Sequence, residues 1–187
     1  LVPEGKEQLV ADKLREVVAG NNYFLDFGLL GSKTVPAMLT KYGYIEDAMK
    51  MITKTEAPSW GYWVETMGYS TLPETWTLSP KFADASLNHV FMGDVSAWMM
   101  NQLAGINHDD SAPGFRHIRI TPHFVKELDW AKGEYHSVRG RIASEWKREG
   151  DQVMLTVTIP ADCSADIVVG DQTETVSAGT HTFSYPV

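Results

Sequence analysis

Residues 57–89 hold most of the side chains in this sequence that could do chemistry. The stretch APSWGYWVETMGYSTLPETWTLSPKFADASLNH carries three tryptophans, two glutamates, one aspartate and one histidine. Hydrolysis of a glycoside needs one carboxylic acid to protonate the leaving oxygen and one carboxylate to activate water or attack the sugar. Indole rings offer a stacking surface and shift the titration of nearby carboxylates by making their surroundings less polar. The middle of the stretch is irregular, which favours a site on a loop held by a rigid scaffold.

Each of these residues also has a simpler interpretation. Glu74, between Pro73 and Thr75, fits a solvated loop charge as well as one half of a catalytic pair. His89 fits a histidine near a helix start with a satisfied hydrogen bond, and Asp26 in FLDFGLLGS is equally open. Residue types alone leave both interpretations standing.

Other chemistries lack their motifs. The histidines at positions 108, 117, 123 and 136 show neither HxxxH nor HxH spacing, so no metal site is predicted. The sequence has no GxSxG and no GxxxxGK[ST], and we expect no cofactor. Cys163 is the single cysteine, which excludes an intrachain disulfide and has no context that marks a nucleophile.

Composition narrows the range of partners. The 187 residues are 43% hydrophobic, enough for a core, and the net charge is −8. An acidic chain without a block of lysines or arginines is a poor candidate for nucleic acid or an anionic membrane. No run of 18 apolar residues predicts a membrane span. The opening LVPEGKEQLV lacks the marks of a signal peptide and leads directly into a helical pattern, so we expect a piece of a longer protein, and localisation stays open.

The first half of the sequence has helical periodicity. Apolar residues recur at helical spacing, and glycine, asparagine and proline mark the ends of the segments. These segments cannot bury all of their broad apolar faces against one another, so we expect further helices to cover them. The predicted helices cover residues 7–20, 32–43, 44–54, 58–68 and 86–105.

The second half alternates with the period of strands. Residues 140–147 and 152–160 flank a glycine-containing turn, and shorter strands are predicted at 115–120, 164–170 and 181–186. This pattern predicts an antiparallel β-sandwich of six to eight strands. The fold class is therefore α+β and multidomain, with helices over 1–107 and the β-sandwich over 108–187.

Several blocks resemble a known family in sequence and in order. PSWGYW, STLPETW, SLNHVFMGDVSAWMMNQLAGI, PGFRHIRITP and LDWAKGEYHSVRGRIASEWKREGD together resemble the C-terminal part of bacterial α-L-rhamnosidases of glycoside hydrolase family 78. The resemblance implies the last helices of an (α/α)6 barrel followed by a β-sandwich. It also implies hydrolysis of terminal α-L-rhamnose with inversion, which uses two carboxyls and a water.

The resemblance also implies roles for single residues. STLPE occupies the place of the family's T-T-x-W-E type motif, so Glu74 is the candidate general base, although Pro73 stands where many members have tryptophan. Asn88-His89 matches the family's asparagine–histidine pair, with His89 bonding a sugar hydroxyl. The family's general acid lies far upstream and has no match here. The remaining candidate sugar contacts are Trp60, Trp63, Trp76 and Asp26.

The resemblance implies two partners, a rhamnose-containing glycoside or polysaccharide and the N-terminal half of the barrel. Two alternatives remain at this point. One is a different carbohydrate-active (α/α)6 enzyme, such as a phosphorylase, for which residues 69–84 offer only Lys81 as an anion ligand. The other is a non-catalytic carbohydrate-binding fragment.

Overall fold

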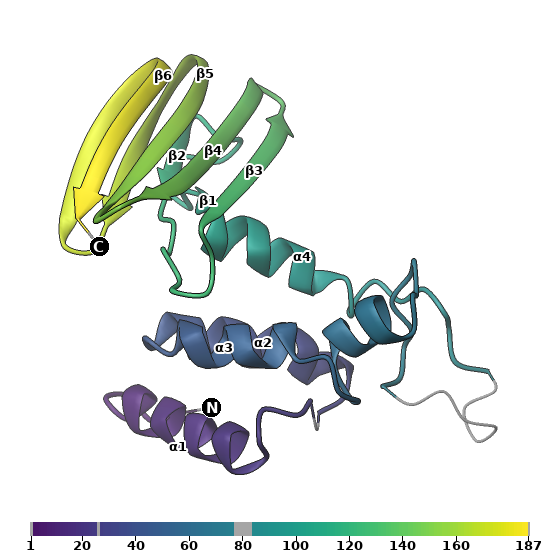
Figure 1. Ribbon diagram of the computed structural model, residues 1–187. Coiled ribbons are helices and arrows are strands. Elements are labelled where there is room, and N and C mark those ends of the chain that lie inside the picture. Colours follow the sequence, from purple (N-terminus) through teal and green to yellow (C-terminus); the bar gives the residue numbers. More distant parts are fainter. Residues whose placement is uncertain (1, 26, 77–83, 187) are drawn as a thin grey trace. The chain divides into compact units, whose positions relative to one another are not determined.

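The computed structural model describes residues 2–25, 27–76 and 84–186 and divides into two compact units (Figure 1). The first unit ends at Ala97 and the second begins at Trp98. This division falls inside a continuous helical stretch, α4 (Asp94–Trp98) followed by the π-helical turn η3 (Met99–Leu103). The predicted division at 107/108 lies beyond this stretch and stays a prediction.

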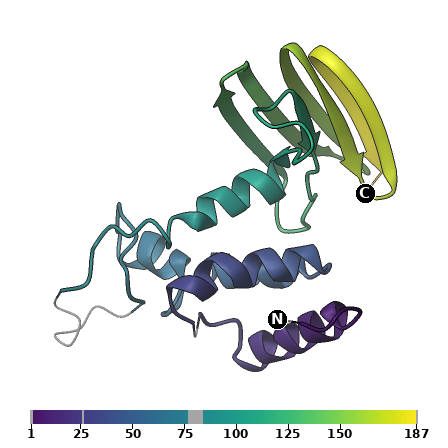
Figure 2. The same cartoon turned by 180° about the vertical axis from the view of Figure 1, so that it is seen from behind.

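The first unit is built from helices. It contains α1 (Glu7–Gly20), α2 (Leu29–Lys41), α3 (Ile45–Thr53) and the π-helical turn η1 (Tyr62–Thr66). Figures 1 and 2 show α2 and α3 lying alongside each other, with α1 next to them. The buried side chains of this unit come mainly from α3 and from the loops. They include Leu25, Leu39, Ala48, Met49, Met51, Ile52, Trp60 and Trp63.

Glycine sets the turn from α2 into α3. Gly43 has φ +87°, its N–H donates to the Thr40 carbonyl (3.0 Å), and the Tyr44 N–H donates to the Leu39 carbonyl (2.8 Å). This pair of bonds is a Schellman motif, which satisfies carbonyls at the helix end and favours glycine at the left-handed position. The C-terminal end predicted at Gly43 therefore agrees with the structure to within two residues.

Two predicted helices are shorter in the structure. The helix predicted over 86–105 begins only at Asp94, because the preceding backbone bonds elsewhere: the His89 N–H donates to the Leu72 carbonyl (2.8 Å). The helix predicted to start at Pro58 begins only after residues 58–59, which are not helical. In the opposite direction, α2 starts at Leu29, so Pro36 lies inside it and not in its first turn as predicted.

The second unit is mostly sheet. Its strands are β1 (Ile106–His108), β2 (His117–Ile120), β3 (Trp130–Ser137), β4 (Gly140–Glu149), β5 (Gln152–Val169) and β6 (Gln172–Pro186). They form one six-stranded sheet in the order β1-β2-β5-β4-β3, with β6 also paired to β5. The β2–β5 pair is parallel, which corrects the prediction of an antiparallel domain; the other four pairings are antiparallel.

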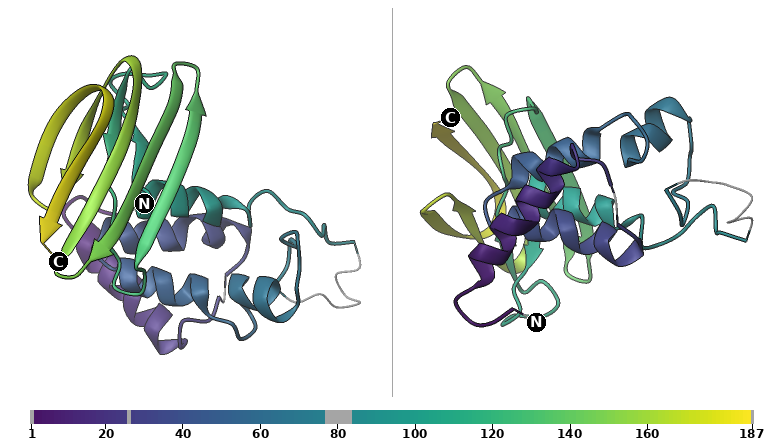
Figure 3. Two further views of the ribbon diagram at one scale, coloured as in Figure 1. Left: turned by 45° about the horizontal axis from the view of Figure 1, so that its top comes forward. Right: turned by 90° about the horizontal axis from the view of Figure 1, so that it is seen from below.

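The length of β5 explains the mixed sheet. The register with β6 shifts between Ile159 and Ser164; before the shift β5 pairs with β4, and after it β5 pairs with β2. The segments predicted at 164–170 and 181–186 are thus the ends of two long, bent strands (Figure 3). Residues on both parts of β5 are buried, including Val153, Leu155, Val157, Ala165 and Ile167, so both parts face the core.

The helical turn η3 packs on this core. Trp146 is fully buried, and its Nε1–H donates to the Leu103 carbonyl at the end of η3 (2.7 Å). Gly133 lets the backbone of β3 approach closely, because a Cβ at this position would lie 2.5 Å from that of Ala104. No helix among the described residues is both long enough and apolar enough to cross a membrane.

Candidate functional site

Two buried tryptophans form the base of the candidate site. Trp60 and Trp63 are 4% and 1% exposed. Ser59 fixes the helical turn that carries them, because its Oγ accepts the Tyr62 N–H (2.9 Å). Trp76 packs against both rings: it stacks on Trp63 at 4.6 Å between centroids and meets Trp60 edge-on at 5.1 Å. Burying these rings fixes the position of Trp76 and of the chain next to it.

Trp60 also holds the chain that leads into α4. Its Nε1–H donates to the Met92 carbonyl at 3.0 Å, and the Ser32 Oγ donates to the Phe91 carbonyl at 3.2 Å. On the other side, the Trp76 Nε1–H donates to the Phe27 carbonyl (2.6 Å). The buried indole of Trp60 therefore contacts the segment that precedes residues 77–83 in the sequence, through Trp76, and the segment that follows them, through Met92.

These two segments bond directly to each other. We call residues 71–74 the first arm and residues 86–89 the second arm. The Glu74 N–H donates to the Ser86 carbonyl and the His89 N–H to the Leu72 carbonyl, both at 2.8 Å. The Thr71 Oγ donates to the Leu87 carbonyl (2.7 Å). The pairing places Glu74 and His89 on adjacent arms, although they lie 15 positions apart in the sequence.

The arms orient the functional groups of Glu74 and His89, which are both half-buried. The Glu74 Oε2 accepts the Ser86 N–H at 3.0 Å, and among the described residues Oε1 has no hydrogen-bond partner. The His89 Nδ1 accepts the Phe91 N–H at 3.3 Å, and the two rings meet edge to face at 5.4 Å. A neutral imidazole that accepts at Nδ1 carries its proton on Nε2, where it can donate to a ligand.

A cleft of about 300 Å³ borders the two arms. Its lining combines hydroxyl-bearing residues with apolar ones, a composition that suits a sugar, which has both hydroxyl groups and apolar C–H faces. The lining residues are Gly68, Tyr69, Ser70, Thr71, Pro73 and Leu87.

The structure separates the predicted site residues into two groups. Glu74, His89 and Trp76 lie on or next to the arms. Trp60 and Trp63 are packed in the core, so they offer no open ring face in this chain, and they support Trp76 where we had expected direct sugar contact. Asp26 lies outside the described residues.

Sequence reasoning missed Ser86 and Thr71. Both residues hold the arms together, Ser86 through its backbone and Thr71 through its hydroxyl. The only signal in the sequence was their position on either side of the Glu74 loop, since serine and threonine often bond nearby backbone. Among the described residues, no group of three or more His, Cys, Asp or Glu side chains is placed to hold a metal ion.

Both halves of the chain match protein-family models. Residues 1–103 match the bacterial alpha-L-rhamnosidase 6 hairpin glycosidase domain, and residues 105–184 match the bacterial alpha-L-rhamnosidase C-terminal domain. The chain belongs to the bacterial α-L-rhamnosidase family. Its helices are thus part of a six-hairpin glycosidase domain, and its sheet unit is the family's C-terminal domain.

Individual rhamnosidases match nearly all of the chain. It is 27% identical over 173 residues to an α-L-rhamnosidase of Streptomyces avermitilis, covering 89% of this chain and 16% of the relative. It is 26% identical over 175 residues to one from an Alteromonas species, covering 90% of this chain and 19% of the relative. The chain therefore spans less than a fifth of the length of these relatives.

Solved rhamnosidase structures share the fold. The α-L-rhamnosidase of Dictyoglumus thermophilum superposes with a TM-score of 0.86 at 26% identity, covering 100% of this chain and 24% of the other. The α-L-rhamnosidase of Aspergillus terreus gives 0.89 at 26% identity, covering 97% of this chain and 22% of the other.

Proposed function

We propose that this chain is the C-terminal part of a glycoside hydrolase that releases terminal α-L-rhamnose with inversion, and that Glu74 is its general base. The observation that carries the proposal is the state of the Glu74 carboxylate. Its Oε2 is held by the Ser86 N–H, while Oε1 has no partner among the described residues. A general base needs this combination of a fixed orientation and an oxygen free to accept a proton.

In the proposed reaction the Oε1 of Glu74 accepts a proton from a water molecule. The oxygen of that water attacks the anomeric carbon from the face opposite the leaving group, and the glycosidic bond breaks. A carboxylic acid, contributed by the part of the enzyme that precedes this chain, gives its proton to the leaving oxygen. One proton is taken up and one is delivered, so the two carboxyls exchange states during a turnover.

The other site residues would bind the sugar. His89 donates from Nε2 to a sugar hydroxyl, and the half-buried Trp76 offers its ring to the apolar side of rhamnose. Trp60 and Trp63 hold Trp76 in place. Asp26 remains a proposed sugar contact, and the cleft beside the arms is the proposed place for part of the substrate.

The helices would complete a barrel together with the chain that precedes them. The exposed side of α1 supports this assignment, because Leu9, Val10 and Val17 are 63%, 45% and 60% exposed. These residues line an open groove together with Lys13 and Leu14, and an apolar stripe of this kind is normally covered by another element. We assign residues 1–107 to the barrel and 108–187 to the C-terminal domain.

Replacement of Glu74 in the complete enzyme tests this function. Glu74→Gln keeps the shape of the side chain and an acceptor oxygen for the Ser86 N–H but cannot take the proton. We expect turnover of an aryl α-L-rhamnoside to fall by about 10²–10⁴ with little change in rhamnose binding. Glu65→Gln, an exposed glutamate on η1, is the matched control and should retain turnover. Near wild-type turnover of Glu74→Gln would reject the proposal.

A further inference from the structure

We propose that Ser86 is a positioning residue for Glu74: its hydroxyl fixes the short backbone segment whose N–H orients the Glu74 carboxylate. The inference rests on the proposed function, since it concerns how the base is aimed. It adds a residue that neither the family match nor the motif around Glu74 assigns.

Ser86 contacts Glu74 twice through its backbone. Its N–H donates to the Glu74 Oε2 at 3.0 Å, and its carbonyl accepts the Glu74 N–H at 2.8 Å. The first bond holds the end of the glutamate side chain and the second holds its backbone. Because both bonds reach the same residue, any rotation of the Ser86 backbone moves the carboxylate relative to its own arm.

The Ser86 hydroxyl restrains that rotation. Its Oγ accepts the Asn88 N–H at 3.2 Å and donates to the Asn88 carbonyl at 3.0 Å. A serine hydroxyl that bonds backbone two residues ahead stabilises a local turn. Here the turn is the second arm, and its end is fixed by the His89 N–H, which donates to the Leu72 carbonyl (2.8 Å).

Exposure separates this role from a role in folding. Ser86, Leu87 and Asn88 are all exposed, so the Ser86 side chain fills no core space and its removal leaves no cavity. A small displacement of a catalytic group can lower the rate about a hundredfold without loss of fold. Ser86 is therefore expected to affect turnover more than stability.

The test compares three variants in the complete enzyme with an aryl α-L-rhamnoside. Ser86→Ala removes the hydroxyl, and Ser86→Thr retains it. Ser111→Ala is the matched control, because Ser111 is also exposed and also makes a local turn, with its N–H and Oγ both donating to the Asp109 Oδ1 at 2.8 and 2.7 Å.

We expect Ser86→Ala to lower kcat about tenfold to a hundredfold, with KM and the melting temperature close to wild type. Ser86→Thr should recover most of kcat, and Ser111→Ala should match wild type. In a Glu74→Gln background, Ser86→Ala should lower kcat no further, because residues that act through one group are not additive.

The outcomes are distinguishable. If Glu74→Gln loses turnover but Ser86→Ala keeps wild-type kcat, the positioning role is wrong and the proposed function stands. If Ser86→Ala lowers kcat equally in both backgrounds, or lowers the melting temperature along with it, Ser86 acts through the fold and the inference is overturned. If Glu74→Gln itself keeps turnover, the proposed function fails and this inference fails with it.

Discussion

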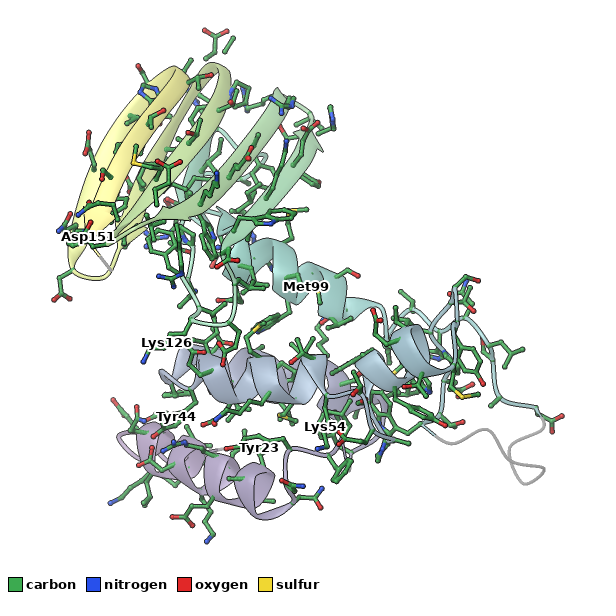
Figure 4. The ribbon with its side chains drawn as sticks, viewed as in Figure 1. Tyr23, Tyr44, Lys54, Met99, Lys126 and Asp151 are labelled. Atoms are coloured by element: carbon green, nitrogen blue, oxygen red, sulfur yellow. The ribbon has the colours of Figure 1, made fainter. Side chains whose placement is uncertain are left out.

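Asp47 is a buried carboxylate whose charge is compensated by its neighbours. Its side chain is 6% exposed, and it accepts from the Arg15 Nε at 2.6 Å and from the Tyr23 hydroxyl at 3.1 Å. Figure 4 shows Tyr23 and Tyr44 close to α1, where the Tyr44 hydroxyl donates to Asp12. Burial raises the pKa of Asp47, but these hydrogen bonds and the charges of Arg15 and Lys50 outweigh it, so the pKa lies below its ordinary value.

This lowered pKa predicts how stability depends on pH. A carboxyl with a depressed pKa stabilises the fold above its unfolded value of 3.8, and this contribution is lost as the pH falls through the folded pKa. We expect Asp47→Asn to destabilise the chain by about 1–3 kcal/mol at pH 7. The difference from wild type should shrink below the unfolded value, as measured by urea unfolding at neutral and acidic pH. Asp171→Asn, in an exposed turn, is the control and should show neither effect.

For single residues, the sequence indicated which side chains could do chemistry better than it indicated how those side chains are packed. A glutamate close to several tryptophans in sequence led to the proposed role of Glu74, and the predicted place of Glu74 on a loop is confirmed. Whether an indole faces a ligand or the core depends on packing between distant segments, which residue types do not encode. The burial of Trp60 and Trp63 was not predicted for this reason. Ser86 was missed because its bond to Glu74 runs through the backbone.

The helices and strands were predictable where the signal is local. The pattern over 7–20 matches α1 residue for residue, since apolar spacing and its ends lie within one segment. The predicted start of the helix that contains α4 was wrong by eight residues, because the competing hydrogen bonds come from the first arm. The parallel β2–β5 pair was missed because a pairing partner 47 positions away leaves no mark in either strand's own pattern.

The bend of β5 gives a prediction at the scale of the strand. Asp162 lies within the register shift and has φ +58°, a left-handed conformation that β-branched residues disfavour. Asp162 is exposed, so its replacement removes no core contact. We expect Asp162→Val to destabilise the sheet unit by about 1–2 kcal/mol and Asp162→Gly to be neutral or slightly stabilising. Equal urea midpoints for Val and Gly would show that the bend does not depend on this conformation.

For the whole molecule, the exposed apolar side of α1 gives a test of the proposal that further helices cover it. The 187-residue chain alone should bind an apolar dye at Leu9, Val10, Leu14 and Val17, which lie in the exposed groove. It should not hydrolyse an aryl α-L-rhamnoside, because losing one of two acid–base groups costs about 10²–10⁴ in rate.

A matched pair of variants locates the dye. The double change Leu9→Lys and Val17→Lys should reduce dye fluorescence without lowering stability, because both side chains are already exposed. Val138→Lys, at a site that is 93% exposed on the turn between β3 and β4, should leave the fluorescence unchanged. An equal loss of fluorescence in both variants would show that the dye binds elsewhere. Turnover of the aryl α-L-rhamnoside by the isolated chain would show that this chain contains the general acid.

The proposed role of Glu74 is to activate the water that attacks rhamnose. In the complete enzyme, Glu74→Gly removes the base and leaves space that a small azide ion can occupy. Azide needs no base, so it should restore bond cleavage with an activated aryl α-L-rhamnoside, attacking from the face that the water used. The measurement is the anomeric configuration of the rhamnosyl azide by NMR. If Glu74 is the base, the product has the β configuration; an α-configured product, or no rescue by azide, would show that Glu74 does not activate the water.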